Sequence, residues 1–230
     1  MAEVKILIEG YAKQLPALAP EGPAAVGRPA VSGAGPVGWV ASSTTCLITS
    51  GGKKIITDPG CNREKLLATL ASEGLRTSDI DYVFLSHQHP DHILLAGIFE
   101  KAKFATFDTN LLYDNDRMLE FDPHVLGTDI EILDTPGHVL EHLSLLVDTP
   151  QGKVAIAGDA IWWLADESQE FRMDQPDHSQ AKGMDLAKLI ASRKKLLARA
   201  DFVIPGHGRM FPVTAAMRNA SASPEPNQAP

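Results

Sequence analysis

Four residues of metal-ligand type fall within six positions of the segment LSHQHPDHIL: His87, His89, Asp91 and His92. On an extended segment His87 and His89 point to the same side, because side chains alternate along a strand. Pro90 cannot continue a strand ladder, so the chain is predicted to turn there and to place Asp91 and His92 at the start of a helix. Imidazole and carboxylate ligands together suit Zn²⁺, and also iron or manganese, so the segment predicts a metal site.

Three further segments share one design, in which an apolar strand ends in a turn that carries a residue of ligand type. They are ILDTPGH, which ends in His138, VAIAGD, which ends in Asp159, and FVIPGH, which ends in His207. Each of these residues alone would be interpreted as an ordinary turn residue. Strand ends are where a fold can bring ligands from distant positions together, so the three segments and the first one predict a single site.

The elements that must position these residues alternate between strands and helices. The sequence pattern predicts strands over 4–12, 81–86, 103–107, 130–136, 143–149, 152–158 and 201–206, a hairpin over 44–60, and helices over 62–73, 92–101 and 184–199. Residues 13–38 are rich in Ala, Pro and Gly and are predicted to form an irregular loop near the cleft, and residues 215–230 a flexible tail. With no linker between complete cores, the order predicts one α/β domain over residues 1–230.

The composition narrows the class of partner. A formal charge of −8 and a pI of about 5.4 argue against binding to nucleic acid phosphates or to an anionic membrane surface. The expected partner is therefore a small-molecule substrate, and a homodimer is left open. Two cysteines without a CxxC motif exclude a disulfide framework, and neither a targeting segment nor a membrane span is found, which predicts a cytoplasmic protein.

Taken together, these motifs resemble those of the metallo-β-lactamase-fold hydrolase superfamily. TDPG (57–60) resembles its first motif, with Asp58 as the structural aspartate, and HQHPDH resembles the second. The resemblance implies a four-layer αββα sandwich with two metal ions in a cleft at the sheet edges. The implied ligands are His87, His89 and His138 for the first ion, Asp91, His92 and His207 for the second, and Asp159 as the bridge. Asp58 would lie behind them and orient a ligand.

The resemblance also implies hydrolysis. Two divalent ions, with zinc preferred and iron or manganese as alternatives, would generate a metal-bridging hydroxide that attacks a small ester, lactone, thioester or phosphoester. Asp91 is the implied catalytic residue, because it can accept a proton during attack or pass it to the leaving group.

Other activities stay open at this stage. The mononuclear-iron persulfide dioxygenases resemble the same fold. The N-terminal ILIEGYA and the loop rich in Ala, Pro and Gly resemble the small branch named metallo-β-lactamase-domain-containing protein 1, which raises a nuclease acting on single-stranded nucleic acid. The acidic charge argues against that activity. A non-enzymatic zinc site would need only four ligands.

Three bulky side chains near the motifs are assigned supporting roles. His142 lies where related lactonases and thioesterases often have a histidine, and the alternative is a buried, hydrogen-bonded imidazole. Trp162 and Trp163 follow Asp159 by three and four positions. Both are candidates to line the substrate cleft as an apolar wall. Core packing is the alternative for each, and a split of the two roles between them is left open.

Overall fold

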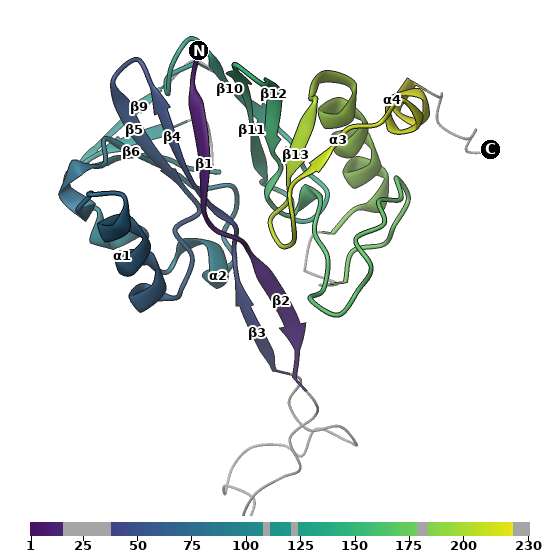
Figure 1. The fold of residues 1–230 in the computed structure, drawn as a ribbon, viewed down its shortest axis with the longest axis horizontal. Helices are drawn as coiled ribbons and strands as arrows, with labels where there is room; N and C mark the ends of the chain where they lie inside the picture. Colours follow the sequence, from purple (N-terminus) through teal and green to yellow (C-terminus); the bar gives the residue numbers. More distant parts are fainter. Residues whose placement is uncertain (16–37, 108–110, 121–123, 179–183, 223–230) are drawn as a thin grey trace, which may run out of the picture.

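Two mixed β-sheets pack face to face in the computed structural model, which describes residues 1–15, 38–107, 111–120, 124–178 and 184–222 (Figure 1). The first sheet has the strand order β1-β4-β5-β6-β7-β8-β9. Its strands are β1 (Glu3–Ile8), β4 (Thr45–Ser50), β5 (Lys53–Thr57), β6 (Tyr82–Phe84), β7 (Lys103–Ala105), β8 (Leu111–Asp114) and β9 (Arg117–Glu120). β4 and β5 form the predicted hairpin, and β5, β6 and β7 run parallel.

The second sheet has the order β10-β11-β12-β13-β14. Its strands are β10 (Ile130–Asp134), β11 (Leu143–Thr149), β12 (Gly152–Ile156), β13 (Phe202–Ile204) and β14 (Phe211–Pro212). β12 and β13 are parallel, and the chain crosses between them through α3 (Leu186–Arg199). Parallel neighbours require such a crossover, which the predicted helix over 184–199 supplies.

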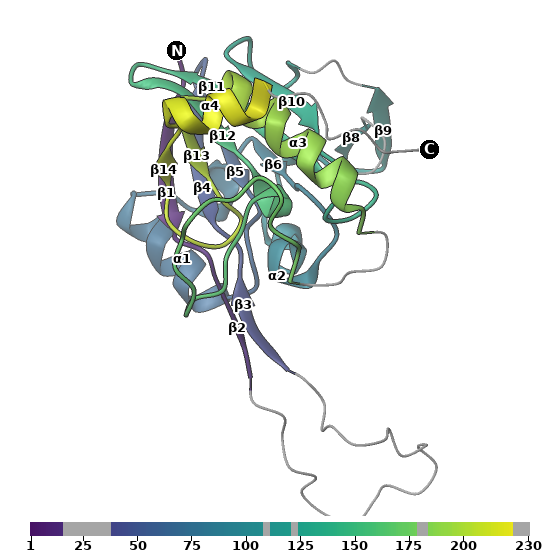
Figure 2. The ribbon, with the colours of Figure 1, turned by 90° about the vertical axis from the view of Figure 1, so that its right-hand side faces the viewer.

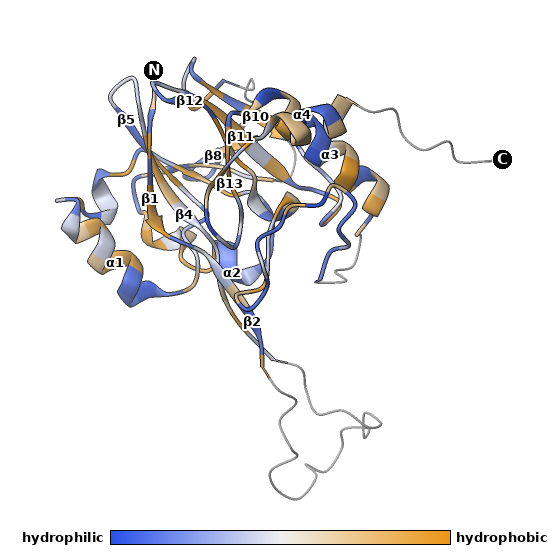
Figure 3. Cartoon of the chain, turned by 45° about the vertical axis from the view of Figure 1, so that its right-hand side comes forward, coloured by the Kyte–Doolittle hydropathy of each residue, from blue (hydrophilic) through white to orange (hydrophobic). Residues whose placement is uncertain are grey.

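Helices cover the outer face of each sheet, and the main core lies between the sheets (Figures 1 and 2). Ile48, Ile55 and Leu145 are fully buried in that central layer. α1 (Arg63–Ser72) adds Leu66 and Leu70 to a second core on the outside of the first sheet. α3 does the same for the second sheet, and Figure 3 shows its alternation of hydrophobic and hydrophilic residues. The four-layer αββα sandwich predicted from the motifs is therefore confirmed.

The strand predicted over 4–12 is wrong in one respect, because the chain forms two strands there. β1 ends at Ile8, and β2 (Tyr11–Gln14) pairs with β3 (Trp39–Ser42) in a hairpin that projects from the sandwich (Figure 1). The irregular loop predicted over 13–38 is accordingly wrong for the end of β2, and residues 16–37 lie outside the described residues.

Gly10 lies at the break between β1 and β2. Its backbone N donates to Thr44 Oγ1 at 3.0 Å, and a Cβ at this position would lie 2.3 Å from the carbonyl oxygen of Gly206. The chain therefore leaves the first sheet where a side chain has no space.

The helix predicted over 92–101 is wrong. Only α2 (Pro90–Ile93) and a 3₁₀ turn, η2 (Ala96–Ile98), form there. The backbone N of Leu95 donates to the carbonyl of Gly60 at 3.1 Å, and the carbonyl of Asp91 accepts from Ser43 at 3.1 Å. These tertiary hydrogen bonds replace the intrahelical bond that would continue α2, so the segment is fixed to the TDPG turn instead.

The tail predicted over 215–230 is wrong for its first part. α4 (Ala215–Ala222) packs along α3, and the guanidinium of Arg218 contacts Asp201 at 2.6 Å. Residues 223–230 lie outside the described residues. The β8–β9 hairpin and β14 had no predicted counterpart. Within the described part of the chain, no helix is long and apolar enough to span a membrane.

Candidate metal centre

The seven residues proposed as ligands all follow strand ends, and they meet at one edge of the sandwich. His87 and His89 follow β6, Asp91 and His92 lie in α2, His138 follows β10, Asp159 lies in the 3₁₀ turn η3 (Gly158–Ala160) after β12, and His207 follows β13. α2 also lies at this edge, beside the β2–β3 hairpin (Figures 1 and 2). The structure thus brings together segments that are 120 positions apart (207 − 87) in the sequence.

The first group consists of His87, His89, His138 and Asp159, whose ligand-type atoms all lie within 4.8 Å of one another. Nδ1 of His89 lies 2.9 Å from Nε2 of His87 and 3.0 Å from Nε2 of His138. Oδ2 of Asp159 completes the group at 3.7 Å from His87 Nε2 and 3.4 Å from His138 Nε2.

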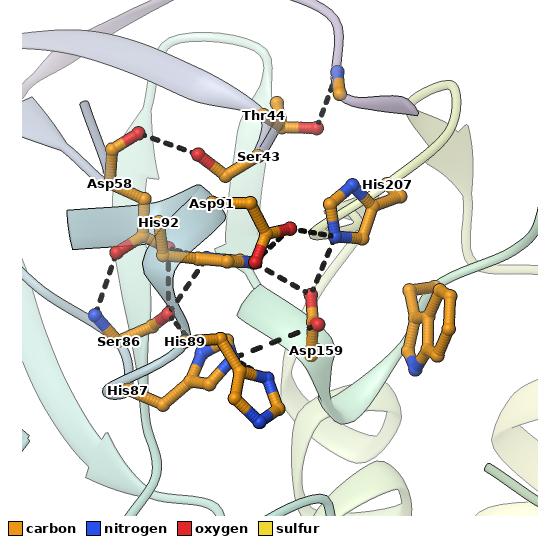
Figure 4. Close-up of polar contacts among 12 residues, drawn as sticks. Ser43, Thr44, Asp58, Ser86, His87, His89, Asp91, His92, Asp159 and His207 are labelled. Carbon is orange, nitrogen blue, oxygen red and sulfur yellow. Dashed lines mark hydrogen bonds and ion pairs between the residues drawn. The ribbon is translucent and has the colours of Figure 1, made fainter. Parts of the chain in front are cut away.

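The second group consists of Asp91, His92 and His207 (Figure 4). Oδ2 of Asp91 lies 3.3 Å from Nε2 of His207 and 3.9 Å from Nε2 of His92. The other oxygen of Asp159, Oδ1, faces this group at 3.3 Å from His92 Nε2 and 3.6 Å from His207 Nε2. One carboxylate therefore contacts both groups, with one oxygen directed to each.

These residues fit metal ions. In the first group three imidazole nitrogens converge on one point with a carboxylate oxygen, which is the donor set that zinc and other transition metals prefer. In the second group, Nε2 of His92 and Oδ1 of Asp159 are buried and make no hydrogen bond within the described residues. Buried polar atoms normally have a partner, and an ion between the two atoms would provide one.

Charge in the site is balanced between carboxylates and imidazoles. Burial opposes the charged forms, yet the negative charges of Asp159 and Asp58 raise the pKa of His92 well above its ordinary value. Burial likewise opposes the charge on His207, and Asp159 outweighs it and raises the pKa of His207 to about 9. The pKa of Asp159 is correspondingly lowered well below its usual range, against the effect of burial. In the first group, burial and neighbouring imidazoles lower the pKa of His87 and of His89, which leaves them neutral.

Asp58 lies behind the second group, as the TDPG motif predicted. Its Oδ2 lies 3.0 Å from Nδ1 of His92, and both of its oxygens accept hydrogen bonds from Ser86, from the backbone N at 2.8 Å and from Oγ at 2.6 Å (Figure 4). The hydroxyl of Ser86 also lies 3.0 Å from Nδ1 of His87. Asp58 therefore orients His92 directly and His87 through Ser86. In both cases the contact is made to Nδ1, the ring nitrogen that faces away from the proposed metal positions.

His142 is buried beside the site and holds the turn that carries Asp159. Its Nε2 accepts from the backbone N of Asp159 at 3.1 Å, and its Nδ1 lies 2.9 Å from Thr135 Oγ1. Burial lowers the pKa of His142 to about 3, so Nε2 keeps the lone pair that this hydrogen bond needs. His142 is therefore a buried, hydrogen-bonded imidazole, and it lies behind the ligand Asp159.

Trp162 and Trp163 take different positions. The ring of Trp162 lies 5.6 Å from that of His207 and 6.2 Å from that of His138, and it lines the cleft over the two groups. Trp163 packs against Phe211 in the core beneath α3. Of the two cleft candidates, Trp162 therefore lies at the cleft and Trp163 in the core, and contact of Trp162 with a substrate stays a prediction.

The cleft in front of the two groups has a volume of about 450 Å³. Besides ligand-type residues, its lining is mostly apolar: Ala12, Trp39 and Ala41 from the β2–β3 hairpin, and Pro90, Leu94 and Trp162. Cys61, the residue after TDPG, lines it as well. No Lys or Arg is among the described residues of this lining.

Sequence reasoning missed two buried charged residues near the first group. Asp177 lies with its carboxylate against Nδ1 of His138, and Arg193 of α3 holds the loop that carries Asp177. Neither lies in a recognisable motif. The segment around Asp177 is polar and without periodicity, so its composition predicts an exposed loop. Arg193 is a polar residue that interrupts the apolar face of a predicted amphipathic helix, and the sequence gives it no other role.

Comparison with known proteins agrees with this geometry. The family model of the metallo-beta-lactamase superfamily matches residues 38–107. The chain is 34% identical to metallo-beta-lactamase domain-containing protein 1 of Mus musculus, with 91% of this chain and 84% of that protein covered. It is 32% identical to hydroxyacylglutathione hydrolase of Rhodopseudomonas palustris, over 42% of this chain and 39% of that protein. Among solved structures, a metallo-beta-lactamase family protein of Thermus thermophilus superposes with a TM-score of 0.57 at 19% identity, over 93% of this chain and 77% of that one.

Proposed function

The chain belongs to the metallo-β-lactamase superfamily and is a metal-dependent hydrolase, and on that premise we propose that two divalent metal ions work together in its site. The observation that carries the proposal is the position of Asp159, whose Oδ2 faces the first group and whose Oδ1 faces the second. A carboxylate shared in this way is typical of two-metal sites. The first ion would be held by His87, His89 and His138, and the second by Asp91, His92 and His207.

Two bound ions would supply Lewis acidity toward a carbonyl or phosphoryl oxygen and would make water nucleophilic near neutral pH. The protein's own part is to hold the groups and to move a proton. Asp91 is suited to the proton, because its side chain is 24% exposed toward the cleft while His92 and Asp159 are buried. Burial raises the pKa of Asp91, but His207 and His92 lower it by more, so the carboxylate is ionised at neutral pH and can accept a proton.

A small, largely uncharged substrate suits the cleft. Its volume of about 450 Å³ is that of a small-molecule site, and Trp39, Leu94 and Trp162 make its walls apolar. Lys and Arg, which bind phosphate backbones, are absent from its described lining. We therefore propose an ester, lactone or thioester as the substrate class, with a small phosphoester next and a nucleic acid last.

The complete second group favours hydrolysis over the mononuclear-iron dioxygenase alternative, because that chemistry needs one ion and its open positions. Zinc is the proposed metal on the basis of the imidazole-rich first group, with iron and manganese as the alternatives. We also propose a cytoplasmic location, which suits two free cysteines.

The test is a substrate panel run on protein reconstituted with zinc, iron or manganese, with metal content measured on the same sample. The panel contains ester, lactone, thioester, phosphodiester and β-lactam substrates, and a His89→Ala variant is the blank. We expect two metal equivalents per chain and turnover of at least one carbonyl substrate that the blank does not show. Less than one equivalent of any transition metal, with no gain in activity on adding metal, would overturn the proposal. Oxygen uptake on glutathione persulfide at one equivalent of iron would replace it with the dioxygenase.

A further inference from the structure

A carboxylate outside the family motifs lies directly behind the first group. The side chain of Asp177 is 0% exposed, and its Oδ2 lies 2.5 Å from Nδ1 of His138. The same oxygen accepts a hydrogen bond from Nε1 of Trp162 at 3.3 Å. Because a carboxylate accepts hydrogen bonds, it favours the tautomer of His138 that carries its proton on Nδ1 and keeps the lone pair of Nε2 directed at His89 and Asp159.

The loop that carries Asp177 is fixed from α3. Arg193, which is 4% exposed, donates from Nη1 to the carbonyls of Met173 at 3.0 Å and Gln175 at 2.6 Å. Its Nε donates to the carbonyl of Ala160 at 2.9 Å. One guanidinium therefore joins the loop that carries Asp177 to the turn that carries Asp159, and its planar fork directs N–H groups at all three carbonyls.

Burial lowers the pKa of Arg193 to about 10, while Asp177 and Asp174 support its charge. The guanidinium thus stays protonated at neutral pH. The buried positive charge of Arg193 thus lies close enough to the Asp177 carboxylate for the two side chains to attract each other.

Asp177 contacts a histidine of the first group in the same way as Asp58 contacts a histidine of the second group. Asp58 contacts Nδ1 of His92 at 3.0 Å, and Asp177 contacts Nδ1 of His138. Among the described residues, the other two buried histidines of the groups use neutral partners at Nδ1: His87 the hydroxyl of Ser86, and His207 the carbonyl of Ser42 at 3.1 Å. Each group therefore has one histidine with a carboxylate behind it.

From these contacts we propose that Asp177 is a positioning residue for the first metal ion, acting through His138, and that Arg193 holds Asp177 in place. The proposal rests on the proposed metal site. Asp58 belongs to the TDPG motif, whereas Asp177 comes from the polar loop before α3. The first ion would accordingly depend on a segment that no ligand motif includes.

The experiment is a stepwise titration of metal-free protein with Co²⁺, followed by its visible absorption spectrum, and with Zn²⁺ against a chromophoric chelator. The variants are Asp177→Asn, which keeps the side-chain volume, Asp177→Ala, and Arg193→Lys, which keeps the charge but loses the fork. Outer-shell partners of ligands change metal affinity about 10- to 100-fold. We expect Asp177→Asn to weaken the step assigned to the first group by that factor and to shift its cobalt spectrum, while the step of the second group is unchanged. Arg193→Lys should act in the same direction with a smaller effect.

The matched control is Glu170→Gln, which removes an exposed carboxylate from the same loop and should leave both steps unchanged. Asp58→Asn is the counterpart, and it should weaken chiefly the step of the second group, because Asp58 contacts His92 directly and His87 only through Ser86. Wild-type metal affinities in Asp177→Asn, in a protein that melts at the wild-type temperature, would overturn the proposal. Equal weakening of both steps would also overturn it, because that result describes a general structural role. If wild-type protein itself takes up no metal, the proposed function fails first, and the two failures are thereby distinguished.

Discussion

Oδ1 of Asp159 lies 3.3 Å from Nε2 of His92, and both atoms are buried without a hydrogen bond to any described residue. Oδ2 of the same carboxylate lies 3.4 Å from Nε2 of His138 in the other group. Asp159 is thus the point at which the two groups meet. Removing its charge should affect both ions at once, unlike a change at any histidine.

We predict that Asp159→Asn reduces metal content from two equivalents to one or fewer. The neutral amide presents one oxygen and one N–H₂ group, so at least one of the two groups meets a donor where it needs an acceptor. The loss of affinity should exceed the about 10- to 100-fold typical of outer-shell changes. Metal analysis after gel filtration measures this, and Asp166→Asn at an exposed position is the control. Two tightly held equivalents in Asp159→Asn would show that Asp159 is not shared.

Metal binding should release protons from the second group. In metal-free protein the pKa of His207 is raised to about 9 and that of His92 is raised well above its ordinary value, so both imidazoles are protonated at neutral pH. A metal ion needs the neutral ring, so loading should release about two protons per chain and should tighten as the pH rises toward 9. Calorimetry in buffers of different ionisation enthalpy counts these protons. Affinity that is independent of pH between 6 and 9 would contradict the prediction.

The raised pKa of His207 also predicts how the stability of the metal-free protein changes with pH. Because the folded-state pKa of His207 lies above its unfolded value, its protonation stabilises the fold fully below pH about 6.5, and this contribution is lost as the pH rises through about 9. Metal-free protein should therefore melt at a lower temperature at pH 9 than at pH 6.5, and metal-loaded protein should not show this loss.

Gly206→Ala is predicted to disturb the site through Asp159. A Cβ at Gly206 would lie 1.9 Å from Oδ1 of Asp159 and 2.8 Å from the backbone carbon of Gly158. The carboxylate must move away from the second group, and the fold should lose about 1–3 kcal/mol, as overpacked sites do. Metal content and thermal melting measure the two effects. Gly97→Ala is the control, because nothing lies within 4 Å of the added Cβ, and its effect should stay within about 0.5 kcal/mol.

Much of this organisation was readable from the sequence, because strand periodicity and turn residues are local signals. The hairpin around Gly51 and Gly52, the helix from Arg63, and the strand ends that carry His138, Asp159 and His207 all depend on neighbours in the sequence. The spacing of HQHPDH likewise placed His87 and His89 on the same side of one segment.

The errors share a physical cause, which is that tertiary contacts overrode local preference. The helix expected after His92 stops because the backbone N of Leu95 bonds to Gly60. The first strand breaks at Gly10 because Gly206, nearly 200 positions away (206 − 10 = 196), fills the space. Asp177 contacts His138 from a loop whose carbonyls bind Arg193 of α3, and such a contact leaves no pattern in the sequence.

The two adjacent tryptophans should separate binding from stability. Trp163 is 2% exposed and packs on Phe211, so Trp163→Ala should cost about 3–5 kcal/mol of unfolding free energy. Trp162 forms a wall of the cleft, so Trp162→Leu should raise KM and should destabilise the fold less than Trp163→Ala does. Denaturant unfolding and steady-state kinetics on the substrate found in the panel compare the two variants. Equal effects of both variants on KM would contradict the assignment of one to the cleft and one to the core.

The two cysteines should react differently with alkylating reagents. Cys46 is fully buried, and burial raises the pKa of its thiol to about 12, so it should not react in the native protein. Cys61 is partly exposed in the cleft, and its thiol donates to the carbonyl of Ala41 at 3.1 Å. Burial, and then the charge of Asp91, raise the pKa of Cys61 too, so its alkylation should be slow at neutral pH and should accelerate about tenfold per pH unit below its pKa, since the thiolate is the reactive form.

We therefore expect one equivalent of iodoacetamide per native chain, located at Cys61 by peptide mass analysis, and two per denatured chain. Activity should fall in parallel with this first equivalent, because the added group occupies the space between the β2–β3 hairpin and Asp91. A Cys61→Ser variant should take up no label in the native state. Labelling of Cys46 before Cys61 would contradict the assigned burial of the two thiols. Full labelling of Cys61 with activity intact would show that the substrate does not enter through this cleft, and the apolar walls around Trp39 and Leu94 would then no longer argue for an uncharged ester, lactone or thioester.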